Sequence, residues 1–263
     1  MSRSKRKPSA KGGTRRLSQH FITSRSLLTR ITRIGRIGKN DLVIEIGTGK
    51  GHLTQALARR ADVVRSIDID RKVLEQAKRR LADTDNVELE EADILTYHLP
   101  KQGDYKVFAN IPFHLTTKIV DRLTGAPNPA TDIWLIMEKG AALKLIGKPE
   151  ENDRSLRMKV EWDLSIRYYF QRRDFHPPPS VDCVLLHFKK KATPDIAKSE
   201  IDAFSRFVKH ARQRGLFGSQ KLLTKKQISV ALKRADLPPI PTDGQILYVQ
   251  WLALFRCYRE IRR

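Results

Sequence analysis

The sequence predicts an α/β protein in which a doubly wound, mostly parallel sheet carries helices on both faces and is followed by a small helical domain. Three observations lead to this fold class. Short apolar runs alternate with stretches of helical spacing from residue 42 to residue 188. A glycine-rich turn directly follows the first apolar run, and beyond residue 194 only helical spacing recurs.

Each apolar run predicts one strand of a sheet of about seven strands. The runs are Leu42–Ile46, Val63–Asp68, Val87–Leu89, Tyr105–Ala109, Ile133–Met137, Leu164–Tyr169 and Cys183–Phe188. Helical spacing is found at Leu27, Leu28, Ile31 and Ile34, at His52–Arg60 and at Arg71–Leu81. Because a doubly wound sheet binds its ligands at the carboxyl ends of its strands, we expect the functional residues there.

A composition break after the last run marks a domain boundary, which we place between residues 190 and 191. Lys189, Lys190 and Lys191 are followed there by Ala192, Thr193 and Pro194. Beyond the break, helical spacing recurs at Ile201, Phe204, Phe207 and Ala211 and later at Leu247, Trp251, Leu254 and Tyr258. We therefore expect residues 17–190 to form the sheet domain and residues 191–263 a helical domain.

The charge of the chain is large and unevenly distributed. The chain carries 51 Lys and Arg against 29 Asp and Glu, a formal net charge of +22. Residues 1–40 hold twelve basic and no acidic residues, residues 189–263 hold seventeen basic and six acidic ones, and residues 41–188 are nearly neutral. Two basic segments around a neutral domain indicate a polyanionic partner, RNA or DNA, bound by a disordered arm at residues 1–16 and by the helical domain. A basic surface kept for solubility is the alternative.

No feature of the sequence indicates a membrane or an oxidising compartment. No apolar stretch reaches the length of about 18 residues that a membrane helix needs. The two cysteines, Cys183 and Cys257, lie far apart without a metal-ligand spacing, and the seven histidines are scattered. We expect a cytoplasmic protein without a metal site.

The glycine-rich turn has the form of a nucleoside-binding loop. The segment Glu45-Ile46-Gly47-Thr48-Gly49-Lys50-Gly51 follows the first strand, and Asp68 closes the second strand 21 residues after Gly47. Glycines let a ligand approach the backbone, and an acid at that distance accepts hydrogen bonds from ribose hydroxyls. The spacing G-x-G-x-G differs from the G-x-G-x-x-G of dinucleotide oxidoreductases and looks like the S-adenosylmethionine loop of class I methyltransferases. A tight turn without a ligand is the alternative.

Asp93 follows the third strand, where folds of this kind place a carboxylate against the adenine amine of the cofactor. A lone aspartate in this place is more often a helix cap. Asp93 nevertheless belongs to the series Gly47, Asp68, Asp93 and Asn110, whose members stand at the ends of the first four strands. The series predicts a Rossmann-like class I methyltransferase domain.

The segment Asn110-Ile111-Pro112-Phe113 closes the fourth strand. A flipped adenine presents an amine with two donors and a flat face, so a site that methylates it needs paired acceptors and an aromatic platform. We expect the side-chain oxygen of Asn110 and the carbonyl of Ile111 to be the acceptors, Pro112 to stiffen the turn and Phe113 to stack on the base. The alternative is a proline turn with a phenylalanine in the core.

Together these motifs resemble the Erm group of ribosomal RNA adenine methyltransferases, from about Leu17 to the C-terminal helices. The residues that carry the resemblance are Ser18-Gln19-His20-Phe21-Ile22, Glu45 to His52, Asp68-Ile69-Asp70, Ala92-Asp93-Ile94-Leu95, Asn110-Ile111-Pro112-Phe113 and Phe175-His176-Pro177-Pro178-Pro179-Ser180-Val181. The resemblance implies transfer of a methyl group from S-adenosylmethionine to the N6 amine of an adenine in 23S rRNA, and resistance to macrolides, lincosamides and streptogramin B. It also implies a monomer that acts on large-subunit rRNA free of ribosomal proteins.

The resemblance further implies roles for individual residues. For the cofactor these are His20 and Ile22 over its adenosine end, Gly47 near its methionine end, Asp68 at its ribose and Asp93 at its adenine, with Gly49, Ile69 and Ile94 completing the site. Asn110 would lie between the methyl donor and the target, and Phe175 would help to enclose the target base.

Three residues depart from the usual pattern of that group. His20 stands where the group usually has Asn, so an imidazole replaces the side-chain amide. Asp68 stands for a common Glu and is one methylene shorter, and Phe113 stands for a frequent Tyr, which keeps stacking and removes a hydroxyl. None of the three removes a part that the chemistry requires.

Two other functions fit part of the pattern. The small-subunit rRNA adenine dimethyltransferases share the fold and an Asn-x-Pro-aromatic motif, and the basic arm and the segment 175–181 favour the Erm type over them. A non-catalytic nucleic-acid-binding relative would also keep the fold, but it would not need Gly47, Asp93 and Asn110 intact.

Overall fold

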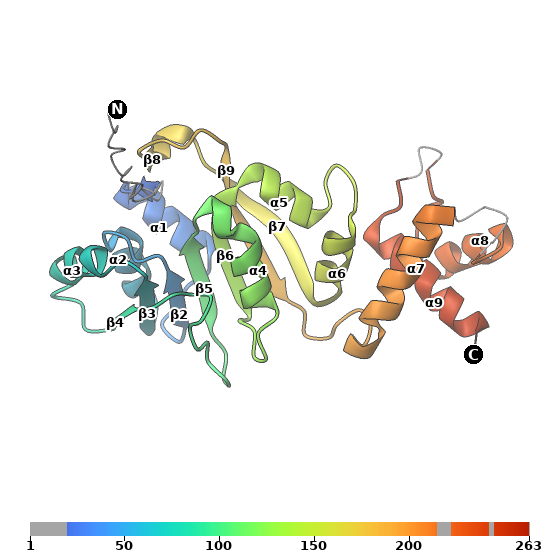
Figure 1. The fold of residues 1–263 in the computed structure, drawn as a ribbon, viewed down its shortest axis with the longest axis horizontal. Helices are drawn as coiled ribbons and strands as arrows, with labels where there is room; N and C mark the ends of the chain where they lie inside the picture. Colours follow the sequence, from blue (N-terminus) through green and yellow to red (C-terminus); the bar gives the residue numbers. More distant parts are fainter. Residues whose placement is uncertain (1–19, 215–221, 242–244, 263) are drawn as a thin grey trace, which may run out of the picture.

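The computed structural model describes residues 20–214, 222–241 and 245–262, and the arm expected at residues 1–16 lies outside these ranges. Figure 1 shows two parts along the long axis of the molecule. One part is a sheet with helices on its faces, and the other contains α7 (Ile201–Arg214), α8 (Lys225–Arg234) and α9 (Tyr248–Ile261). None of the helices in the described ranges has the length and apolar character needed to cross a membrane.

A seven-stranded sheet forms the centre of the larger part. Its strands are, from one edge to the other, β4 (Val87–Glu91), β3 (Val63–Asp68), β2 (Leu42–Ile46), β5 (Lys106–Asn110), β6 (Asp132–Glu138), β9 (Cys183–Lys190) and β7 (Trp162–Tyr169). The pairs among the first five strands are parallel, and β9 is antiparallel to both of its neighbours. The predicted Rossmann-like sheet is therefore confirmed. The strands β2 and β3 have the predicted bounds, whereas the other five extend into polar residues beyond the predicted ranges, because backbone pairing continues where the apolar signal has ended.

The structure also contains a second, two-stranded sheet, which no pattern in the sequence predicts. In it β1 (Phe21–Ile22) pairs antiparallel with β8 (Phe175–His176), with Phe21 opposite His176 and Ile22 opposite Phe175. Strands of two residues are too short to show an alternating pattern, and the partners lie far apart in the chain. Only the folded protein brings these two segments together.

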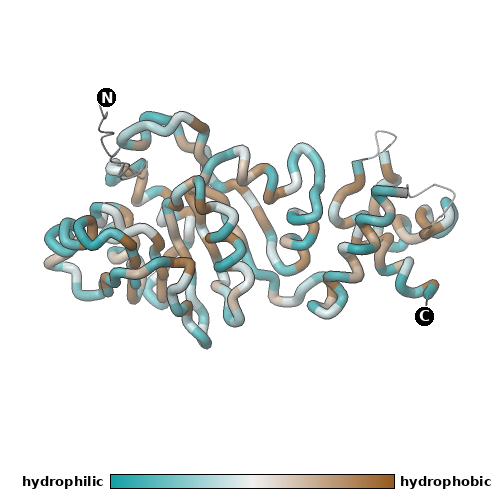
Figure 2. The backbone as a smooth tube through the Cα atoms, in the orientation of Figure 1, coloured by the Kyte–Doolittle hydropathy of each residue, from teal (hydrophilic) through white to brown (hydrophobic). Residues whose placement is uncertain are grey.

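Helices cover both faces of the large sheet. The helices α4 (Thr116–Thr124) and α5 (Lys139–Ile146) pack on one face, and α1 (Arg25–Ile34) and α2 (His52–Ala58) pack on the other. Successive residues of β5 point to opposite faces, so Val107 belongs to the first core and Phe108 to the second. Figure 2 shows hydrophobic residues gathered in the central strands, as burial on both faces requires.

The helix α6 (Asp153–Glu161) links the sheet to the C-terminal helices. Leu156 and Val160 of α6 are buried in the same hydrophobic cluster as side chains of α7, α8 and α9. Arg157 of α6 also pairs with Asp202 of α7 at 2.8 Å. The domain division at residue 190 stays a prediction. The helix α6 precedes that point in the chain and packs with the helices that follow it.

Leu156→Ala should lower the free energy of unfolding by about 2 to 5 kcal/mol, because the neighbouring helices close only part of the cavity that is left. Leu156 is 2% exposed. Urea unfolding followed by circular dichroism measures the loss. Met158→Ala is the matched control on the same helix and should cost less, since Met158 is only half-buried. Equal losses for the two variants would contradict a core role for Leu156.

Candidate functional site

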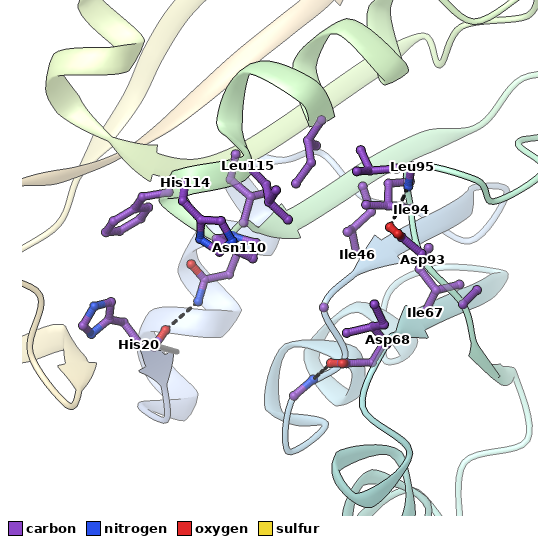
Figure 3. A pocket seen from close by; sticks show the side chains of 18 of the residues that line it. His20, Ile46, Ile67, Asp68, Asp93, Ile94, Leu95, Asn110, His114 and Leu115 are labelled. Carbon is purple, nitrogen blue, oxygen red and sulfur yellow. Dashed lines mark hydrogen bonds between the residues drawn. The ribbon is translucent and has the colours of Figure 1, made fainter. Parts of the chain in front are cut away.

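A cavity of about 300 Å³ lies at the carboxyl ends of β2, β3, β4 and β5. Figure 3 shows side chains from these strand ends pointing into one space. The lining contains His20, Gly47, Gly49, Asp68, Ile69, Asp93, Ile94, Asn110, Ile111, Pro112 and Phe113. The structure thus brings together all the residues that the sequence predicts for the site except Ile22 and Phe175. Phe21, His114 and Leu115 also line the cavity, and the sequence analysis assigned them no role.

The turn after β2 requires glycine at two positions. Gly47 and Gly49 have φ angles of 84° and 52°, in the left-handed region that side chains disfavour. A Cβ on Gly49 would stand 2.9 Å from Cε1 of Phe21, so a side chain there would also push against that ring. The turn therefore presents bare backbone to the cavity.

Asp68 ties this turn to the end of β3. One carboxylate oxygen accepts the N–H of Gly49 at 3.0 Å, and the other accepts the N–H of Asp70 at 3.0 Å. A carboxylate has about four lone-pair sites, so each oxygen keeps capacity for a donor from a ligand. Asp68 is buried and borders the cavity, which suits the acceptance of hydrogen bonds from ribose hydroxyls.

Asp93 caps a turn and also lines the cavity. Its Oδ1 accepts the N–H of Leu95 at 2.9 Å, so a capping bond of the kind that the sequence left open is present. Beside it, Ile69 is 61% exposed and Ile94 is buried, and both give the cavity an apolar wall. An apolar wall next to two carboxylates suits a nucleoside. Within the described ranges no three His, Cys, Asp or Glu side chains gather in a way that could hold a metal ion.

Asn110 is held in one orientation at the end of β5. Its Nδ2 donates to the carbonyl oxygen of His20 at 2.6 Å (Figure 3). Because a carbonyl oxygen only accepts, the amide nitrogen faces His20 and the side-chain oxygen is left as an acceptor. The N–H of Ile111 donates to the carbonyl of Ile136 at 3.2 Å, which fixes the next peptide. Phe113 lies beside them with its ring half-buried.

Ile22 and Phe175 are not part of the lining of the main cavity. They face each other across the β1–β8 pair. Ile22 borders a smaller cavity of about 30 Å³ together with Gly47 and Asn110. Phe175 is 3% exposed, and its ring packs on Phe170 with the centroids 5.3 Å apart. Phe175 is therefore buried among other apolar side chains, and its expected role at the target base stays a prediction.

His20 lies at the Asn110 end of the cavity, away from Asp68 and Asp93 (Figure 3). Its Nδ1 is 2.8 Å from the carbonyl oxygen of Pro177. The resemblance implies a position for His20 over the adenosine end of the cofactor, and this role stays a prediction. In the structure His20 lies beside Asn110, one of the residues expected to hold the target base.

Glu45 is a buried acid under the glycine turn, and the motif alone gave it no role. The hydroxyl of Ser66 donates to Glu45 Oε2 at 2.6 Å, and the hydroxyl oxygens of Ser66 and Thr48 lie 2.7 Å apart. Burial raises the pKa of Glu45 to about 8, although the Ser66 bond acts in the opposite direction. Near neutral pH the carboxyl is therefore mostly protonated. The sequence signal for this residue is an acid within an apolar strand.

Comparison with known proteins gives matches over most of the chain. A family model described as "Ribosomal RNA adenine dimethylase" matches residues 11–236. The curated rRNA adenine N-6-methyltransferase of Limosilactobacillus reuteri is 33% identical over 246 residues, which cover 94% of this chain and 97% of that protein. The protein of the same name from Lysinibacillus sphaericus is 33% identical over 244 residues, which cover 92% of this chain and 95% of that protein.

Two solved structures share the fold. The 23S rRNA methyltransferase ErmE matches with a TM-score of 0.78 at 23% identity, covering 91% of this chain and 99% of that one. A dimethyladenosine transferase from Plasmodium falciparum matches with a TM-score of 0.65 at 21% identity, covering 88% of this chain and 86% of that one. At these identities the likeness concerns the fold, including the C-terminal helices.

Glu45→Gln should flatten the fall of stability with rising pH. The unfolded carboxyl ionises near its ordinary pKa of 4.5, whereas the pKa in the folded protein is about 8. Between these values only the folded state holds the proton, so a rise in pH favours the unfolded state, and glutamine removes this dependence. Urea titrations at several pH values between about 5 and 8 measure it. Glu91→Gln, at an exposed position of β4, should keep the original slope, and an unchanged slope for Glu45→Gln would mean that Glu45 is ionised in the folded protein.

Proposed function

The chain belongs to the ribosomal RNA adenine dimethylase family, and on this premise we propose that it transfers a methyl group from S-adenosylmethionine to the exocyclic N6 amine of an adenine in 23S rRNA. The family confirms the resemblance noted from the motifs and the expectation of an S-adenosylmethionine-dependent rRNA adenine methyltransferase. The observation that carries the proposal is the oriented amide of Asn110, which offers an oxygen acceptor at the cavity.

The residues at the ends of β2, β3 and β4 fit S-adenosylmethionine. The turn at Gly47 leaves room for a ligand against its backbone, Asp68 has acceptor capacity for ribose hydroxyls, and Asp93 has it for the adenine amine. Ile69 and Ile94 provide apolar surface for the flat face of the adenine. When bound, S-adenosylmethionine would supply a methyl group on a positively charged sulfur. The amine nitrogen of the target would attack the methyl carbon while the bond from that carbon to sulfur breaks, and S-adenosylhomocysteine would leave.

The residues at the end of β5 orient the target. Asn110 Oδ1 accepts one N–H of the adenine amine and the Ile111 carbonyl accepts the other, which turns the nitrogen lone pair out of conjugation with the ring. Pro112 restricts the turn that carries these acceptors, and Phe113 offers its ring face to the flipped base. Correct placement of the methyl group and the amine accounts for most of the rate acceleration, so no strong base is needed before the attack. The amine proton leaves to solvent afterwards.

Ribosomal RNA is the substrate of this family, and the charge distribution supports its binding at both ends of the chain. Residues 189–263, which include the C-terminal helices, hold seventeen basic residues against six acidic ones. The enzyme acts as a monomer on large-subunit rRNA that is free of ribosomal proteins, in the cytoplasm where that RNA is made. Contacts to phosphates fix the RNA, while the flipped base enters the cavity.

Asp68→Ala and Asp93→Ala should each weaken S-adenosylmethionine binding by about 1 to 3 kcal/mol, because each leaves buried donors of the ligand without an acceptor. Isothermal titration calorimetry measures the dissociation constant. Asp104→Ala, at an exposed position outside the cavity, is the matched control. Asp93→Ala with wild-type affinity would remove Asp93 from the cofactor site.

Expression of the chain in a macrolide-sensitive bacterium should raise its tolerance to erythromycin. Methylation of one adenine in the peptidyl-transferase loop adds apolar bulk and removes amine donors where macrolides bind, and a loss of about 3 kcal/mol is more than a hundredfold in drug affinity. Primer extension maps the methylated adenine, called the mark below, and it should lie in 23S rRNA. Asn110→Ala should fold, bind the cofactor and lose both the mark and the tolerance.

Methylation of small-subunit rRNA is the alternative outcome of the same experiment. A mark on that rRNA with unchanged erythromycin sensitivity would assign the chain to the dimethyltransferase type that shares its fold. Full activity of Asn110→Ala on either RNA would mean that the target amine is not held by Asn110.

A further inference from the structure

His20 departs from the asparagine of the Erm pattern, and its contacts join three segments of the chain. Its Nδ1 is 2.8 Å from the carbonyl oxygen of Pro177. Its ring lies near-parallel to that of Phe113, with the centroids 5.8 Å apart and an interplanar angle of 23°. Its own carbonyl oxygen accepts the bond from Asn110 Nδ2 at 2.6 Å. His20 thus connects the segment after β8 with both ends of the segment Asn110–Phe113.

The register of the small sheet explains why the imidazole meets Pro177. Phe21 pairs with His176, so the next residues along the ladder, His20 and Pro177, stand opposite each other. Proline has no N–H to continue the ladder. The histidine side chain supplies a donor to the Pro177 carbonyl instead. Because that carbonyl only accepts, Nδ1 carries the proton in this bond.

We propose that His20 is a positioning residue for methyl transfer, whose side-chain bond to Pro177 holds the His20 carbonyl that orients the Asn110 amide. The inference rests on the proposed function, because it assumes that Asn110 holds the target amine. It predicts an effect of His20 on the orientation of the Asn110 amide, which is separate from any contact of the His20 side chain with the cofactor.

The side-chain amide of Asn110 has a donor end and an acceptor end, so its orientation decides which of them faces the cavity. Asn110 exposes an acceptor to the cavity only while its nitrogen is bound elsewhere, and the His20 carbonyl is the partner that binds it. If that carbonyl shifts, the amide is free to rotate and to present its own N–H groups. Donors would then face the donors of the adenine amine, and the bond that holds the amine in place is lost.

Substitutions at His20 separate the hydrogen bond from the ring contact. His20→Ala removes both, His20→Phe keeps a ring beside Phe113 without a donor, and His20→Gln keeps a donor without a ring. We expect the single-turnover rate at saturating S-adenosylmethionine and rRNA to fall about tenfold to a hundredfold in the Ala and Phe variants. The Gln variant should recover most of the rate. The dissociation constant of S-adenosylmethionine, measured by calorimetry, should stay as in the unmodified protein.

A double substitution tests whether His20 acts through Asn110. In an Asn110→Ala background, His20→Ala should cause no further loss of the residual rate, whereas independent roles would give losses that multiply. His176→Ala is the matched control, because it removes an exposed histidine from the same small sheet. Thermal unfolding of each variant shows that the fold is kept, and the Gln variant serves if the Ala variant does not fold.

The outcomes distinguish this inference from the proposed function. A normal rate in His20→Ala together with a low rate in Asn110→Ala overturns the positioning role and leaves the proposed function standing. A weaker S-adenosylmethionine affinity with a normal rate at saturation makes His20 a cofactor contact and also overturns it. A normal rate in Asn110→Ala overturns the proposed function itself.

Discussion

The parallel pairing of β2 with β3 and with β5 is the constraint on which the site depends. Ile46 at the end of β2 pairs with Ile67 on one side and with Ala109 on the other, so the three strands end at one edge of the sheet. The ladder continues into the glycine turn, where the N–H of Gly47 donates to the carbonyl of Ile67 at 2.8 Å. The turn, Asp68 and Asn110 therefore meet because of backbone hydrogen bonding, and the site inherits the rigidity of the sheet.

Two acids lie next to the glycine turn and have different surroundings. Asp68 accepts the N–H of Gly49 and borders the cavity, where its carboxylate keeps capacity to accept a hydrogen bond from a ligand. Glu45 lies beneath the turn and accepts a hydrogen bond from Ser66, whose hydroxyl oxygen lies 2.7 Å from that of Thr48. Burial raises the pKa of Glu45, because a charged carboxylate loses its hydration in the protein interior.

Packing, in addition to the connecting segment, joins the catalytic sheet to the basic C-terminal helices. Leu156 and Val160 lie on a helix that precedes β7 and yet belong to the hydrophobic cluster of α7, α8 and α9. The helices expected to bind rRNA are thereby attached to the domain that we propose to hold the target base. A shared core of this kind resists separation of the two parts more than a flexible linker would.

The sequence by itself determined the seven main strands and the motifs at their ends. Apolar periodicity is a local property, and a parallel sheet necessarily collects Gly47, Asp68, Asp93 and Asn110 at one edge. Only the tertiary structure decided that Phe175 is buried and that His20 lies beside Asn110. Both depend on the pairing of β1 with β8, two strands too short to leave a pattern in the sequence. Local sequence patterns also could not predict the raised pKa of Glu45 or the packing of α6 with the C-terminal helices. Both depend on burial, which is set by the segments that the folded chain packs against each side chain.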